Sequence, residues 1–145
     1  MKKVLFSFLF VACVVFFGTQ SMAGTESYET KVAPFTIDVP DGWVGKAIAD
    51  GCSVQTPDGA NALVVQFFPA NQMTAMEAAK MMADMVKMTI SSEKDEGSAA
   101  FLDGNKDGTP WAVLMVKEET MLMAVQFAGK ERDKMMEIYK TVKGK

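Results

Sequence analysis

The sequence predicts an α+β domain in which helices pack on an antiparallel sheet. Segments that alternate apolar and polar residues, each bounded by turn residues, are typical of strands with one buried face. Two other segments repeat their apolar residues at the helical period. Because short turns join the strands, we expect antiparallel pairing, with helices covering the sheet on both sides. The prediction is an α/β/α-type sandwich with the element order βββαβββα.

The first three strands are predicted before the first helix. Residues 35–39 alternate with period two and end at the Pro-Asp-Gly turn of residues 40–42. Residues 52–56 alternate again and are joined by the Pro-Asp-Gly turn at 57–59 to the apolar run 62–68. Because this run is apolar on both faces, it predicts a central strand that is covered on both sides.

A helix is predicted over residues 73–90. Its alanines and one row of methionines share a face, and charged residues lie opposite. Thr74 followed three residues later by Glu77 is a capping box, which marks the start of the helix. The charged residues 91–97 predict a loop.

The second half repeats the pattern of strands followed by a helix. Three strands are predicted at about 99–102, 110–117 and 120–128, and Gly129 ends the last of them. Residues 130–142 place their apolar side chains at helical spacing and predict a final helix.

The N-terminus has the three regions of a secretory signal peptide. Lys2 and Lys3 supply the positive charge, residues 4–17 carry no charge, and small residues precede Gly24. The apolar run is shorter than the roughly 20 residues that a membrane-spanning helix needs. We therefore expect residues 1–23 to be a signal peptide that is cleaved before Gly24.

Cleavage would leave a periplasmic or secreted protein with no transmembrane anchor. The polar residues 24–31 predict a flexible leader, and residues 32–145 have the length of one α+β domain. The formal net charge of the chain is −3, and the loss of two lysines makes it more negative. An acidic protein with dispersed lysines is not expected to bind nucleic acid.

The composition also excludes several kinds of catalysis. The chain has no histidine, which removes Ser-His-Asp and Cys-His catalysis and the usual zinc sites. Cys52 is the one cysteine that follows residue 23, and it alternates in phase with Val54, as a buried side chain would. A reactive thiol or an intermolecular disulfide is the alternative for Cys52. The prediction is a protein that is not an enzyme and has no cofactor.

The opening strand and turn, residues 35–43 (Phe-Thr-Ile-Asp-Val-Pro-Asp-Gly-Trp), together with the element order, resemble the PsbP-like and DcrB-like domains. The resemblance covers most of residues 32–143 and matches no functional-site motif. It implies an extracytoplasmic accessory or binding protein without catalytic activity. With the export signal, it predicts a protein that acts through a surface for an envelope protein or a small apolar ligand.

Methionines form the most unusual feature of the first predicted helix. The chain has 13 methionines, and Met76, Met81, Met85 and Met88 recur there at spacings of three to five residues. Thioethers are soft ligands that select Cu(I) or Ag(I), and helical spacing brings two sulfurs to one face. The alternative function is therefore a periplasmic soft-metal binding protein that uses these four methionines. Core filling, as expected for Met82, or a partner surface are the other interpretations.

Residues 103–108 (Asp-Gly-Asn-Lys-Asp-Gly) match the first half of a calcium-binding loop. The second half does not match, because Leu114 stands where the loop requires a bidentate glutamate and Pro110 lies inside it. The composition therefore favours a polar turn between two strands.

Overall fold

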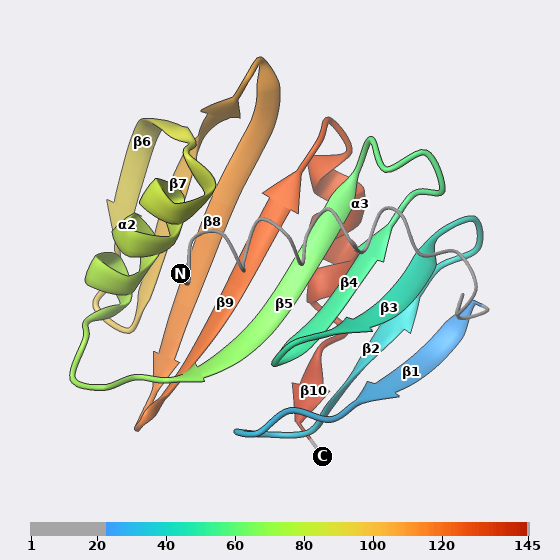
Figure 1. Cartoon of the computed structure of the whole chain (residues 1–145), viewed down its shortest axis with the longest axis horizontal. Coiled ribbons are helices and arrows are strands. Elements are labelled where there is room, and N and C mark those ends of the chain that lie inside the picture. Colours follow the sequence, from blue (N-terminus) through green and yellow to red (C-terminus); the bar gives the residue numbers. More distant parts are fainter. Residues whose placement is uncertain (1–22, 145) are drawn as a thin grey trace.

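The computed structural model of the chain describes residues 23–144, which form two antiparallel sheets and two helices (Figure 1). The larger sheet has seven strands in the order β3 (Val44–Ile48), β4 (Gly51–Gln55), β5 (Ala62–Pro69), β9 (Met121–Ala128), β8 (Thr109–Glu118), β7 (Ala99–Lys106) and β6 (Thr89–Asp95). The smaller sheet has the order β1 (Gly24–Tyr28), β2 (Phe35–Val39) and β10 (Lys143–Gly144). The helices are α2 (Ala75–Val86) and α3 (Arg132–Tyr139).

The elements form three layers, with the seven-stranded sheet in the middle. Helix α2 packs on one face of this sheet, against β6, β7 and β8, which we call the α2 face. Helix α3 and the smaller sheet lie on the other face, the α3 face (Figure 1). Alternation along the central strands supplies both cores, so that Val113 of β8 packs beneath α2 while its neighbour Ala112 packs toward α3. The predicted α+β class, with helices on an antiparallel sheet, is confirmed.

Helix α2 begins at the predicted capping box. The Thr74 hydroxyl accepts the backbone N–H of Glu77 at 3.1 Å, and the Glu77 carboxylate accepts the backbone N–H of Thr74 at 3.0 Å. The predicted extension to residue 90 is wrong. The helix ends at Val86 because Lys87 adopts a left-handed backbone conformation with φ of 62°.

Residues 91–97, predicted as a loop, contain most of strand β6 instead. This strand forms the edge of the larger sheet and pairs antiparallel with β7. Its side chains from Ser91 to Asp95 are all exposed. An edge strand of this kind is held by backbone hydrogen bonds and buries few side chains, so it carries no apolar alternation.

Residues 24–31, predicted as a flexible leader, contain strand β1, which pairs with β2 along its whole length. Tyr28 is the residue that fastens this strand, because it is buried and its ring lies 5.8 Å from that of Phe35. The predicted first strand therefore belongs to the smaller sheet and not to the larger one. Strands β3 and β10 are further additions to the predicted order βββαβββα.

The turn that carried the family resemblance forms as expected. Gly42 has a φ of 82°, which a residue with a side chain rarely adopts, and the Trp43 backbone N–H donates to Pro40 O at 3.1 Å. The Trp43 side chain is buried on the α3 face.

The predicted signal peptide lies, apart from Ala23, outside the described residues. Neither helix within residues 23–144 has the length and apolarity needed to cross a membrane.

Candidate functional site

A cavity of about 360 Å³ opens between the flank of α2 and the sheet beneath it. Its floor comes from β5, β8 and β9, and its rim comes from the β3–β4 turn and the segment that leads from β5 into α2. Small residues on the inner side of α2, among them Ala79 and Ala83, let the helix approach β7 and β8 closely. The longer side chains of α2 then reach over the neighbouring strands, where the cavity lies.

Five methionines line this cavity. They come from the segment before α2, from α2 itself and from β8: Met73, Met81, Met82, Met85 and Met115. Leu122 and Phe68 complete the apolar part of the lining. Methionine side chains are flexible and polarizable, so a surface built from them adapts to apolar partners of different shapes.

The structure brings together two of the four methionines predicted as soft-metal ligands. Met81 and Met85 line the cavity, with 47% of Met81 exposed. Met76 packs against the α2 core and does not line the cavity. Met88 is buried in the same core, because it follows the left-handed residue Lys87 and no longer obeys the helical spacing.

Sequence reasoning missed three of the cavity methionines. Met82 was expected only in the core, yet it contributes to both the core and the cavity wall. Met73 precedes the first helical residue, so a helical wheel gives it no meaningful position. Met115 lies on β8, about 30 residues further along the chain, and only the pairing of the strands places it beneath α2.

Three polar residues line the cavity, Gln66, Asp50 and Asn71. Gln66 of β5 is 2% exposed, and its side-chain Nε2 donates to Ala49 O at 3.0 Å. Asp50 lies in the β3–β4 turn at the rim. No lysine or arginine of the described part of the chain lines the cavity.

The electrostatics near the helix start favour an ionised carboxylate. Hydrogen bonds from the Thr74 backbone and hydroxyl, with the positive charge of Lys117 as a smaller cause, lower the pKa of Glu77. The ammonium of Lys117 donates to Met73 O at 2.8 Å and so fixes the chain at the cavity rim. These contacts hold the wall of the cavity in place and supply no group that is suited to proton transfer.

The half-motif at residues 103–108 was expected to form a turn between strands, but the turn is confined to its last two residues and the first four extend the strand. Asp103 to Lys106 lie in β7, and Asp107 and Gly108 form a two-residue hairpin turn with φ of 51° and 83°. No group of three or more cysteine, aspartate or glutamate residues within 23–144 is arranged to hold a metal ion.

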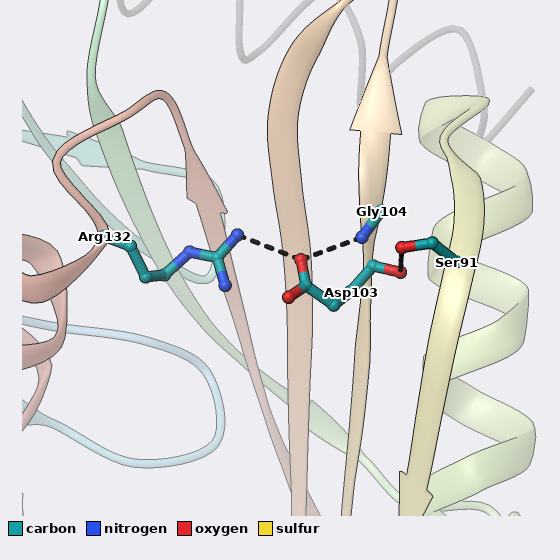
Figure 2. A network of polar contacts seen from close by, with 4 residues as sticks. All are labelled: Ser91, Asp103, Gly104 and Arg132. Carbon is teal, nitrogen blue, oxygen red and sulfur yellow. Dashed lines mark hydrogen bonds and ion pairs between the residues drawn. The ribbon is translucent and has the colours of Figure 1, made fainter.

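Asp103 instead joins helix α3 to the sheet. Figure 2 shows its carboxylate accepting from the Arg132 guanidinium at 3.2 Å and from the Gly104 backbone N–H at 2.9 Å. The Asp103 carbonyl accepts the Ser91 hydroxyl at 3.1 Å, which extends the network to β6 (Figure 2). The guanidinium also lies 5.9 Å from the ring of Phe101. This network is structural, because it fastens the start of α3 on the face opposite the cavity.

Cys52 is fully buried on the α3 face, as its phase with Val54 predicts. It therefore lies on the opposite side of the sheet from the five cavity methionines. A thioether site in the cavity would include no thiolate from this residue.

A second cavity, of about 300 Å³, lies on the α3 face between α3 and the ends of β5 and β9. Met121 and Met123 line it together with Tyr139, Lys140 and Glu118. Burial raises the pKa of the Tyr139 phenol above its ordinary value. The mixture of opposite charges here offers a less uniform lining than that of the methionine-lined cavity.

Comparison with solved structures identifies the architecture. The chain is similar to the solution structure of cyanobacterial PsbP (CyanoP) from Synechocystis, with a TM-score of 0.52 and 12% identity over 90% of this chain and 98% of the other. It is also similar to a crystal structure of a protein from Bacteroides thetaiotaomicron, with a TM-score of 0.52 and 11% identity. That match covers 86% of this chain and 49% of the other. No family model and no curated protein matches the sequence.

At these identities the likeness shows the fold alone. It agrees with the resemblance drawn from residues 35–43 and from the element order. The described part of the chain has a PsbP-like α+β fold, with a methionine-lined cavity on one face of its sheet.

Proposed function

We propose that the chain is an exported, non-catalytic accessory protein that binds an apolar ligand, or an apolar segment of an envelope protein, in the methionine-lined cavity. The observation that carries the proposal is the lining itself, in which five methionines surround about 360 Å³ of space. Cavities that hold small molecules have volumes of this order and are lined mainly by apolar side chains.

The chemistry of the site supports binding rather than catalysis. The chain contains no histidine. Asp50 is the one carboxylate among the described lining residues, and with Gln66 and Asn71 it offers no nucleophile paired with a base. Export, inferred from residues 1–23, would place this surface in a compartment where envelope proteins and lipids are available.

The proposal is tested by native mass spectrometry of the protein purified from its own cell envelope. We expect an apolar molecule or a partner protein to be retained, and the retained species to be lost when Met82 and Met85 are both changed to alanine. The matched control is Met135→Ala, because Met135 is buried on the α3 face. Unchanged retention by the cavity variant would contradict the proposal.

Soft-metal binding is the second candidate function. Met81 and Met85 lie one helical turn apart and share the cavity with three further thioethers. Thioether sulfur binds Cu(I) and Ag(I) in preference to harder ions. Titration with Ag(I) separates the candidates, since uptake that is lost in the variant Met81→Leu with Met85→Leu would support a metal site. If the wild-type protein took up no Ag(I), soft-metal binding would be refuted as a function.

A further inference from the structure

Met81 is the one methionine within residues 23–144 that is exposed to solvent. Its exposed fraction is 47%, whereas Met82 and Met115, which line the same cavity, are 5% and 2% exposed. Every other methionine in this part of the chain is buried or only partly exposed. Because Met81 both lines the cavity and contacts solvent, it lies where the cavity opens.

The position of Met81 on α2 explains this exposure. Its neighbour Met82 packs in the core beneath the helix, and Lys80 on the other side forms an exposed ion pair with Glu93 at 3.3 Å. Met81 therefore lies at the boundary between core and solvent. A helix backbone is enclosed by its own side chains, so most of the exposed area of Met81 belongs to its side chain. A small solute can reach this thioether without any opening of the fold.

An accessible thioether reacts with hydrogen peroxide, which is the oxidant we assign to this site. The sulfur attacks one peroxide oxygen, the O–O bond breaks as the S–O bond forms, and a proton passes to the leaving hydroxide, which departs as water. Sulfur is oxidised by two electrons and the peroxide is reduced by two. Methionine sulfoxide reductases reverse the change with two thiols, which become a disulfide while the oxygen leaves as water.

A sulfoxide at Met81 would change the cavity and leave the core intact. It converts a flexible apolar side chain into a polar one. In the empty cavity the new oxygen stays hydrated, because Met81 already contacts water. An apolar ligand would displace part of that water, and no lysine or arginine among the described lining residues would donate a hydrogen bond in exchange.

We propose that Met81 is a site of reversible oxidation by peroxide, and that its sulfoxide weakens apolar binding in the methionine-lined cavity. Met82 and Met115 line the same cavity but are protected by their burial. The protein would thus release its ligand under oxidising conditions and recover its affinity on reduction. This inference rests on the proposed function, because it assigns a regulation to the same cavity.

The first measurement locates the oxidation. Wild-type protein is treated briefly with hydrogen peroxide, the peroxide is removed, and the added oxygen is mapped by peptide mass spectrometry. We expect Met81 to react about 10-fold faster than Met82 or Met115, in proportion to the exposed fractions. Far-UV circular dichroism should be unchanged by this treatment. Equal rates at the three methionines, or loss of the fold when Met81 alone is oxidised, would overturn the inference.

The second measurement is a fluorescence titration with 2-naphthol before and after oxidation. We expect oxidation to weaken binding by about 3- to 10-fold, as the loss of one net hydrogen bond to water predicts. Treatment with dithiothreitol and methionine sulfoxide reductases for both sulfoxide epimers should restore the affinity. Equal affinities before and after oxidation would overturn the inference while leaving apolar binding intact. Failure of the untreated protein to bind 2-naphthol would instead contradict the proposed function.

Met81→Leu keeps an apolar side chain and removes the sulfur, so peroxide should no longer change the affinity of this variant for 2-naphthol. Met76→Leu is the matched control, because Met76 is a partly buried methionine of the same helix that does not line the cavity. It should lose affinity on oxidation to the same extent as the wild type. A loss of affinity in oxidised Met81→Leu as large as that of the wild type would show that the response comes from another residue.

Discussion

Met81 and Met82 are neighbours on α2 with opposite environments, and they provide a sharp test of how the helix packs. Met82 is 5% exposed, whereas Met81 is 47% exposed, although both reach the cavity. Met82→Ala removes a side chain from the core beneath α2, and such truncations lower the free energy of unfolding by about 2–5 kcal/mol.

Met81→Ala should lower the free energy of unfolding far less than Met82→Ala. About half of the Met81 side chain already contacts water, so the burial that is lost corresponds to roughly half of the 1.5–3 kcal/mol typical of a fully buried side chain. The higher helix propensity of alanine offsets part of this loss. We therefore expect a decrease in the free energy of unfolding of less than about 1 kcal/mol.

Urea denaturation followed by far-UV circular dichroism measures both variants under one set of conditions, and equal slopes would show that their unfolded states are comparable. The reasoning predicts a clear difference between the two midpoints. Equal losses of stability, or a larger loss for Met81→Ala, would show that α2 is rotated about its axis relative to the structure, and the cavity lining would then be wrong.

Four further predictions concern the elements around the cavity. Thr74→Ala should lower the free energy of unfolding by about 0.5–2 kcal/mol in denaturant titrations. Because the pKa of Glu77 is lowered, its carboxylate stabilises the fold above its unfolded pKa, and this contribution disappears as the pH falls through the lowered value. Glu77→Gln should therefore differ from the wild type at pH 7 and converge with it in acid, and a constant difference would refute this. Gly104→Ala should lower the free energy of unfolding by ~1–3 kcal/mol or more, because the new Cβ would lie 1.8 Å from the carbonyl oxygen of Thr89. Unchanged hydrogen exchange of the β6 amides would argue against that contact. Gln126→Leu should be neutral or stabilise by about 1 kcal/mol, because it removes buried polar atoms that lack partners within residues 23–144, and marked destabilisation would contradict this.

The elements that could be predicted from the sequence are those in which burial produces a regular pattern of apolar residues. Strand β5 and its hairpin partner were predictable because both faces of β5 are buried and turn residues separate the two strands. The start of α2 was predictable because the side chains of Thr74 and Glu77 satisfy the first backbone donors of the helix.

The elements that were not predicted are held mainly by backbone hydrogen bonds to a neighbouring strand. Strand β6 exposes nearly every side chain, and β1 buries only Tyr28, so neither shows a periodic apolar pattern. The end of α2 was missed for a related reason. Lys87 adopts a left-handed backbone conformation, which is unusual for lysine and could not be predicted from its residue type. The methionine Met88 extends the helical spacing of the methionines beyond the true end of the helix.

The candidate site shows the same division. Met81 and Met85 could be selected because helical spacing relates them. Met115 could not, because its place beneath α2 depends on the register between β8 and its neighbours. Gln66 was equally hidden, since its orientation comes from Ala49 O in the β3–β4 turn.

The central claim is that the methionine-lined cavity is a binding site for apolar ligands. The most direct measurement is a methyl-NMR titration of the protein labelled at its methionine methyl groups, with 2-naphthol as the probe. The account predicts that the methyl signals of Met73, Met81, Met82, Met85 and Met115 shift together and saturate at one affinity. The signal of Met135, buried on the α3 face, should stay in place. Shifts confined to Met121 and Met123, which line the cavity on the α3 face, or no saturable shifts, would contradict the claim.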